Sequence, residues 1–246
     1  MLSEKDWNDA AQSWFDFVRN GKDFHRDGLN NPATFALIGN VKGQIVLDVA
    51  CGEGYNTRML ARQGAEVLGI DFSERMIELA KKEEEKKKLG IRFGVMDAAD
   101  LRELSDSHFD LVTCFMSLQD IKDYKKAISE VARVLRNRGR FVFSIPHPCF
   151  ESMVVKGKRI RASRRYFEEA KYYLPWDMKR LTKPFRTITF HRTLADYVYA
   201  LYRSMLLVSR LVEPKPTREA LLKQPHLRRH VLVPQSIIVE SVKCTD

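Results

Sequence analysis

Short apolar runs alternate with segments of helical periodicity along much of the chain. Buried parallel strands have this continuous apolar character, and helices of this length between them imply right-handed βαβ units. Most of the runs end in a glycine turn, an aspartate or a proline. The runs cover residues 44–50, 65–70, 91–96, 109–115 and 140–145. The pattern predicts an α/β fold with a doubly wound, mostly parallel sheet and helices on both faces.

Apolar residues at helical spacing predict the elements that lie between and after these strands. Ser73 is a candidate N-cap for one of the helices, and Thr193 is a candidate for another. The predicted helices cover residues 55–63, 74–88 and 124–135, and one more begins after Thr193. Residues 206–212 and 236–242 read as the last two strands, which we expect to include an antiparallel pair.

The first strand runs directly into a glycine turn, Cys51-Gly52-Glu53-Gly54, and the second strand ends in Asp71. Glycine lets the backbone turn sharply and lets a ligand approach closely. Asp71 would then lie at the neighbouring strand tip, within reach of a ribose. A dinucleotide fingerprint would need a third glycine where Thr57 stands, and Glu53 would repel a pyrophosphate. A nucleoside ligand without phosphate fits this turn better.

The stretch from Asp48 to Gly54 resembles the first motif of class I S-adenosylmethionine-dependent methyltransferases, with Ala50 in a slot that is often glycine. Residues 68–80 look like the second-strand segment of the small-molecule branch (methyltransferase types 11 and 25), and residues 131–144 look like its approach to the fifth strand. The resemblance covers residues 44–147 and implies a Rossmann-like, seven-stranded core. It also implies an enzyme that converts S-adenosylmethionine to S-adenosylhomocysteine.

The resemblance also implies roles for individual residues of the cofactor site. Asp48 and the backbone at Ala50 and Gly52 would hold the methionine end of the cofactor, with Gly54 completing the turn. Asp71 would take the ribose hydroxyls, and Phe72 would pack on the adenine. The predicted cofactor residues are Asp48, Ala50, Gly52, Gly54, Asp71, Phe72, Asp97, Ala98, Phe115 and Trp14.

Composition and length lead to a division of the chain. A chain of 246 residues with 44% hydrophobic residues can form one domain with an elaborated lobe. We expect an N-terminal helical lid (1–43), a cofactor-binding core (44–150), a substrate-lobe insertion (151–192) and a C-terminal part of the same core (193–246). The four cysteines lack paired spacing, so no disulfide framework or metal site is expected, and a cytoplasmic protein is the default. No apolar run is long enough to span a membrane.

The N-terminal helix, expected over residues 5–19, has an aromatic face that includes Trp14 and Phe15. Two interpretations stay open. The stripe either packs into the core, or it covers the cofactor cleft, where Trp14 or Phe15 would face the sulfonium through a cation–π contact. Residues 20–43 are rich in turn formers, with a short helix near residues 32–38.

The candidate acceptor site follows the fifth strand. Pro146 ends that strand, and His147, held between two prolines, is a candidate general base, as is His191. Residues 156–165 carry six basic side chains, and aromatic residues follow, among them Tyr173 and Trp176. We expect this lobe to cover an anionic or aromatic small molecule, with Arg192 gripping a carboxylate and with Tyr173 and Trp176 as further acceptor contacts.

A second functional class remains open. Basic residues interleaved with aromatics also bind single-stranded nucleic acid, so the chain could be an RNA methyltransferase or a nucleic-acid-binding protein. The net charge of +10 fits either an acidic partner or a lysine-rich surface. A cytosine-5 methyltransferase is disfavoured, because Cys114-Phe115-Met116 stands where such enzymes carry Pro-Cys. The pattern leaves the acceptor atom (O, N or C) and the oligomeric state open.

Overall fold

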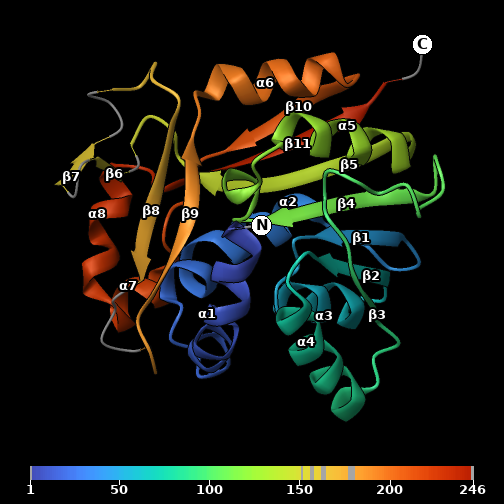
Figure 1. Cartoon of the computed structure of the whole chain (residues 1–246), viewed down its shortest axis with the longest axis horizontal. Helices are drawn as coiled ribbons and strands as arrows, with labels where there is room; N and C mark the ends of the chain where they lie inside the picture. Colours follow the sequence, from blue (N-terminus) through green and yellow to red (C-terminus); the bar gives the residue numbers. More distant parts are fainter. Residues whose placement is uncertain (1, 151, 156–157, 162–164, 177–180, 245–246) are drawn as a thin grey trace.

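The structure is a computed structural model, and it describes residues 2–150, 152–155, 158–161, 165–176 and 181–244. Its centre is a seven-stranded sheet in the order β10-β11-β5-β4-β1-β2-β3 (Figure 1). The strands of this sheet are β1 (Ile45–Val49), β2 (Glu66–Asp71), β3 (Arg92–Val95), β4 (Phe109–Phe115), β5 (Leu135–Pro146), β10 (Leu206–Val212) and β11 (Ser236–Lys243). Only β11 is antiparallel to its neighbours in this sheet, β5 and β10. This confirms the predicted Rossmann-like, doubly wound α/β fold.

Helices cover both faces of the sheet, because alternate residues of each buried strand point to opposite sides. One face packs Leu47, Val112 and Phe143 against α5 (Tyr124–Val134) and α6 (Leu194–Arg203). The other face packs Val46, Leu111 and Val142 against α2 (Asn31–Ile38), α3 (Tyr55–Arg62) and α4 (Glu74–Lys87). Burial on both faces specifies the strand register, because a shift by one residue would turn each side chain to the opposite face.

The ends of β1, β2, β4 and β5 point toward the segments that lie outside the sheet (Figure 1). The first of these segments is α1 (Leu2–Arg19), which contacts α4 and β9. The others are two antiparallel hairpins, β6 (Ser152–Val155) with β7 (Lys158–Arg161), and β8 (Ala170–Trp176) with β9 (Phe185–His191). Tyr173 and Trp176, predicted as acceptor contacts of the substrate lobe, lie on β8.

The segment between the last two strands returns from the sheet to the N-terminal part of the chain. Between β10 and β11 lie α7 (Arg218–Lys223), the short helix η4 (Pro225–Arg228) and α8 (Arg229–Leu232). The backbone N–H of Thr217 donates to the carbonyl of Gly28, in the π-helical turn η1 (Arg26–Asn30). Within residues 193–246, which the prediction grouped with the core, this segment packs on η1 rather than in the sheet. No local sequence pattern had indicated that contact.

Most element boundaries agree with the hydrophobic pattern to within two residues. The largest difference is β5, which begins at Leu135 rather than at residue 140, with Leu135 already pairing with Phe109. Met205, in the turn before β10, has a φ of 57°, a value that glycine normally supplies. The remaining short helix is η2 (Leu118–Asp120), directly after β4.

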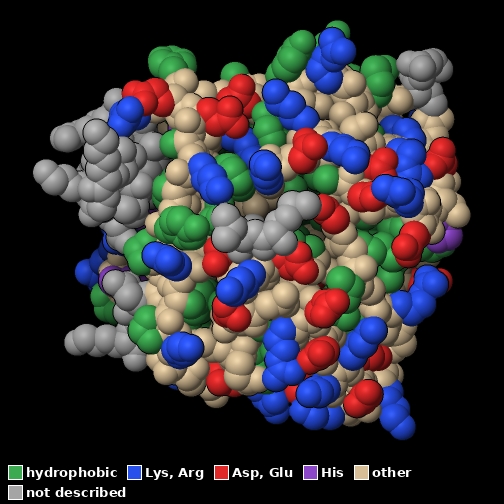
Figure 2. All heavy atoms as spheres, in the orientation of Figure 1, with side chains coloured by type: hydrophobic (Ala, Val, Ile, Leu, Met, Phe, Trp, Pro, Cys, Tyr) green, Lys and Arg blue, Asp and Glu red, His purple; other side chains and the backbone are tan. Residues whose placement is uncertain are grey.

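Charged side chains of both signs are spread over the molecular face in Figure 2. Lys and Arg alternate with Asp and Glu on this face rather than gathering in one patch. Among the described residues, none of the helices has the length and apolar character needed to cross a bilayer.

Candidate functional site

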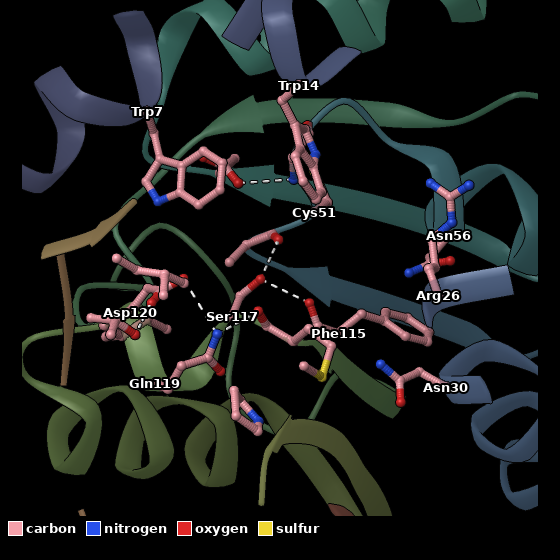
Figure 3. Close-up of a pocket in the computed structure, with 18 of the residues that line it drawn as sticks. Trp7, Trp14, Arg26, Asn30, Cys51, Asn56, Phe115, Ser117, Gln119 and Asp120 are labelled. Atoms are coloured by element: carbon pink, nitrogen blue, oxygen red, sulfur yellow. Dashed lines mark hydrogen bonds between the residues drawn. The ribbon is translucent and has the colours of Figure 1, made fainter. Parts of the chain in front are cut away.

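A cavity of about 1910 Å³ opens where the ends of the parallel strands meet α1, the β8–β9 hairpin and the segment 226–235. This is the place where open α/β sheets bind ligands. In Figure 3, Trp7 and Trp14 lie on one side of the cavity, and Gln119 and Asp120 lie on another. Of the predicted site residues, those that line the cavity are Asp48, Ala50, Gly52, Asp71, Phe72, Asp97, Ala98, Phe115, Trp14 and Trp176.

The glycine turn presents its backbone to this cavity. Ala50 and Gly52 both have positive φ, 53° and 57°. A Cβ at position 52 would meet nothing within 4 Å, so open space lies directly over the backbone of Gly52. Gly54 differs, since it does not line the cavity and a Cβ there would come within 2.8 Å of the Phe93 ring. The structure therefore gives Gly54 a packing role rather than the predicted ligand contact.

Asp71 connects the tip of β2 to the turn after β1. Its Oδ2 accepts from the backbone N–H of Gly52 at 2.9 Å, and its Oδ1 accepts from that of Ser73 at 2.9 Å. Burial nevertheless raises the pKa of the carboxyl to about 6. Each oxygen still has a lone pair for a ribose hydroxyl, so the geometry fits the predicted ribose contact.

Asp48 lies deeper, at the end of β1. Its two oxygens accept from the hydroxyls of Thr57 (2.6 Å) and Thr113 (2.8 Å). Burial raises its pKa to about 7, and the neighbouring Asp71 contributes to the rise. A cationic ammonium group, as at the methionine end of the predicted cofactor, would offset this cost by favouring the ionised form.

The third strand tip supplies the expected adenine side of the cavity. Phe72, Asp97 and Ala98 all line it, and Asp97 Oδ1 accepts from the backbone N–H of Ala99 at 2.9 Å. Phe115 lines the far side and stacks on Phe35. The open backbone at Gly52, the carboxylate of Asp71 and this third tip together suit a nucleoside with a zwitterionic end.

The acidic residue inside the glycine turn forms a buried ion pair. Glu53 Oε2 lies 2.6 Å from an Arg58 guanidinium nitrogen, and a second nitrogen of Arg58 donates to the Glu53 carbonyl. Both side chains are buried. The expected repulsion of a pyrophosphate by Glu53 is therefore weakened, since Arg58 neutralises its charge, and the absence of a third glycine remains the sequence argument against a dinucleotide.

Aromatic side chains from two distant segments form one wall. The ring centre of Trp14 on α1 lies 5.3 Å from that of Trp176 on β8 and 6.0 Å from that of Trp7. Both pairs are packed edge to face. Trp176 stacks on Phe185 at 5.7 Å. Such geometries are the favourable ones for aromatic pairs. The aromatic stripe on α1 therefore faces the cavity as well as the core, and Trp176 lines the cavity beside it.

The turn after β4 contributes polar groups that the sequence interpretation missed. Gln119 Nε2 donates to the Met116 carbonyl at 2.6 Å, and Thr189 Oγ1 donates to Asp120 Oδ1 at 2.5 Å. Met116 has a φ of 50°, a strained conformation typical of functional sites. The signal was available, because this turn follows the end of a parallel strand as directly as residues 51 and 71 do.

Neither predicted general base lines the cavity. His147 is buried, its Nε2 lies 2.9 Å from Glu213 Oε1, and its Nδ1 accepts from the Cys149 backbone N–H. The ring of His191 is fully buried, with Nε2 at 2.9 Å from the Tyr166 carbonyl. These partners occupy both ring nitrogens of His147 and one of His191, which argues against the proton-acceptor roles that the sequence suggested.

Arg192 and Tyr173 also lie away from the cavity. The Arg192 guanidinium donates to the carbonyls of Ile121 (2.7 Å) and Lys122 (3.0 Å) and packs 4.1 Å from the centre of the Tyr124 ring. It is buried and connects β9 to the turn before α5, so this placement contradicts a carboxylate grip. Tyr173 points outward because neighbouring residues of a strand face opposite sides, and Tyr172 faces the cavity instead.

Much of the basic run falls outside the described residues. Residues 156–157 and 162–164 belong to that part, and of Lys158–Arg161 only the strand β7 is described. Among the residues that the structure describes, no group of three or more His, Cys, Asp or Glu side chains could hold a metal ion.

Comparison with known proteins agrees with this geometry. Residues 47–143 match the family model described as a methyltransferase domain. The chain is 33% identical over 141 residues to a ubiquinone biosynthesis O-methyltransferase of Coxiella burnetii (56% of this chain, 58% of the relative). It is 29% identical over 231 residues to a demethylmenaquinone methyltransferase of Clavibacter sepedonicus (85% of this chain, 92% of the relative).

Solved structures extend the match beyond the core. An S-adenosylmethionine-dependent methyltransferase of Mesorhizobium loti superimposes with a TM-score of 0.71 at 27% identity, covering 86% of this chain and 96% of the other. The matched domain contains the glycine turn, Asp71 and the β4 tip, which are the parts of the sheet that open on the cavity. The chain thus belongs to the class I S-adenosylmethionine-dependent methyltransferases and is an enzyme of that family.

Proposed function

We propose that this enzyme transfers the methyl group of S-adenosylmethionine to a small aromatic acceptor. The observation that carries the proposal is the continuous cavity that runs from the strand tips to the aromatic wall of Trp7, Trp14 and Trp176. At about 1910 Å³ it exceeds the ~300–1,000 Å³ of an ordinary ligand pocket, so it has room for a cofactor and an acceptor together.

Residues of the chain would divide the binding work between the two ligands. Asp71 would hold the ribose, Asp97 with the backbone at Ala98 the adenine, and Asp48 with the backbone at Gly52 the methionine end. S-adenosylmethionine would supply an electrophilic methyl group on sulfur. The aromatic wall would orient a flat acceptor for in-line attack and would exclude water, which is the main catalytic contribution expected of such a site.

An acceptor that is a hydroxyl would have to lose a proton. His147 and His191 lie off the cavity, whereas Asp120 lines it beside the strained turn after β4. We therefore propose Asp120, rather than either histidine, as the candidate proton acceptor. A phenol that is already ionised at neutral pH would need no such group.

The relatives support an aromatic acceptor class. Two are named for ubiquinone biosynthesis and for demethylmenaquinone, both of which concern quinone rings. A phenol or hydroquinone-type ring is therefore our first candidate, with oxygen or ring carbon as the methylated atom. None of the relatives cited above favours the RNA alternative that the basic run had left open.

The test is mass spectrometry of methyl transfer. Purified protein would be incubated with deuterium-labelled S-adenosylmethionine and a metabolite extract, and with a panel of phenols and hydroquinones. A labelled small aromatic product would support the proposal. Label found only in RNA, or no binding of the cofactor, would overturn it. Asp120→Asn should then lower kcat for a neutral hydroxyl acceptor while leaving cofactor affinity unchanged.

A further inference from the structure

One end of the cavity is lined by basic and imidazole side chains from two segments far apart in sequence. His25 directly precedes η1, and His226, Arg229 and His230 come from η4 and α8. The ring of His25 lies 5.4 Å from that of His230 and 6.1 Å from that of His226. These four residues are called the basic compartment below.

Polar atoms in this end of the cavity have no partner among the described residues. Nε2 of His25 is buried and makes no hydrogen bond, and Oε1 of Gln235, on the same segment as α8, is also buried and unpaired. A buried polar atom without a partner is costly and uncommon in proteins. A ligand that fills this space would supply the missing partners.

Arg229 supplies the positive charge of the basic compartment. Arg26 is bound to Asp27 through two guanidinium nitrogens, and the Asp23 carboxylate accepts from the Arg26 backbone N–H. Arg229 makes no ion pair with any described carboxylate. Its Nε donates to Nε2 of His230, at 3.0 Å. The charge of Asp27 is thus balanced by Arg26, whereas burial raises the pKa of Asp23 and favours its neutral form. Arg229, an exposed residue that also lines the cavity, has no counter-ion among the described residues.

We propose that the basic compartment binds an anionic group of the acceptor, a carboxylate or a phosphate, through Arg229 and His25. The inference rests on the proposed function, because it assigns a substrate class to the same cavity. Arg229 would provide charge-assisted hydrogen bonds, and Nε2 of His25 would be the second donor. The aromatic wall would hold the ring, and the compartment would fix its anionic end.

The titration of His25 agrees with this assignment. Burial lowers its pKa to about 4, and the nearby His230, Arg229 and His226 contribute to the drop. The other charged groups of its own segment are Lys22, Asp23, Arg26 and Asp27. The packed segment from α7 to α8 adds Arg218, Glu219, Lys223 and Arg228. An anion in the compartment would favour the protonated ring and raise the pKa of His25. Binding of the anion would then take up a proton, so its affinity should rise as the pH falls from about 7.5 to 5.5.

The test measures binding to the full chain loaded with S-adenosylhomocysteine, so that no turnover is needed. The probes are benzoate, phenyl phosphate and neutral benzamide, and the readouts are calorimetry and the pH titration of the His25 ring by NMR. Benzoate or phenyl phosphate should bind about tenfold more tightly than benzamide. A preference for phenyl phosphate would indicate a phosphorylated acceptor, and a preference for benzoate a carboxylated one.

Two variants distinguish the compartment from general surface charge. Arg229→Gln should remove most of the preference for the anion, while Arg228→Gln, one residue away and outside the cavity, should leave it intact. Equal binding of benzoate and benzamide, an unchanged His25 titration, or equal effects of the two variants would overturn the inference. Failure to bind S-adenosylhomocysteine would instead overturn the proposed function.

Discussion

The cofactor end of the cavity is built from strand tips, whereas the acceptor end is assembled from segments that have no place in the sheet. At the cofactor end, Asp48 and Asp71 are desolvated carboxyl groups. Asp71 accepts from the backbone N–H groups of Gly52 and Ser73, and Asp48 accepts from the hydroxyls of Thr57 and Thr113. At the acceptor end, Trp14, Trp176 and Arg229 come from α1, β8 and α8. The first end is specified by a compact motif, and the second by long-range packing.

This difference explains where charge sits in the cavity. Buried carboxylates suit a ligand that brings a cation and hydroxyl groups. They are tolerated because donors from β4, from α3 and from the adjoining turns satisfy their oxygens. Aromatic and basic side chains on separate segments suit a flat acceptor with an anionic end. The contrast predicts that substitutions at one end will leave binding at the other end nearly unchanged.

The largest expected effect is a loss of folding stability when the ion pair inside the glycine turn is broken. Arg58→Met would leave the Glu53 carboxylate buried without its partner and should lower the free energy of unfolding by about 3–5 kcal/mol. Urea unfolding curves of the variant and the parent chain measure this change in the free energy of unfolding. The matched control is Arg62→Met, which removes an exposed arginine from the same helix. Equal losses in both variants would show that the turn does not depend on this pair.

The next effect concerns the ribose contact. Asp71→Asn keeps the shape of the side chain but removes its charge, and it should weaken S-adenosylhomocysteine binding by about 1.5–3 kcal/mol. Calorimetry measures the affinity, with Asp9→Asn on the exposed side of α1 as the control. Benzoate binding in the basic compartment should stay as it is. If Asp71→Asn weakened benzoate as much as the nucleoside, the two ends would not be independent.

A smaller effect concerns the pH dependence of stability without ligand. The pKa of Asp48 is raised to about 7 in the folded state, against 3.8 for an unperturbed carboxyl. A raised pKa means that the protonated form stabilises the fold, so this contribution is complete below pH ~4 and is lost as the pH rises through 7. Asp48→Asn should therefore be more stable than the parent chain at pH 8, by at least ~1 kcal/mol.

Melting curves between pH 4 and 8 measure this difference. Some pH dependence should persist in Asp48→Asn, because the pKa of Asp71 is also raised, to about 6. The variant should gain stability and lose cofactor affinity, as expected where a strained carboxylate serves binding. Parallel melting curves for the two proteins would show that Asp48 is no more desolvated than a surface carboxyl.

The smallest effect should come from the aromatic wall. Trp14→Leu removes the edge contacts with Trp7 and Trp176, which are worth about 0.5–1.5 kcal/mol, and should raise KM for an aromatic acceptor accordingly. Phe167→Leu, at an exposed aromatic residue of the 151–192 segment, is the control. Cofactor affinity decides between two roles. Its loss in Trp14→Leu would assign Trp14 to the sulfonium, as the sequence had suggested, rather than to the acceptor.

The sequence by itself determined the sheet, the glycine turn and the acidic strand tips. The signals are all local: the strand and helix periods, the N-caps Ser73 and Thr193, and the spacing from Gly52 to Asp71. The structure has both caps as predicted. Local signals suffice here because each parallel strand and its following helix pack mainly on their neighbours in the sheet.

Only the tertiary structure decided what the lobe residues do. Sequence spacing gave His147, His191 and Arg192 chemical roles, but burial makes them parts of the framework. His191 and Arg192 have backbone carbonyl partners, and His147 is held by Glu213 and the Cys149 backbone N–H. The basic compartment shows the reverse case, since residues 25 and 226–230 are some 200 positions apart and no periodicity relates them. Long-range packing sets how α1 and the 213–235 segment dock. This docking decides which side of β8 faces the cavity and which residues lie across the cavity from β8.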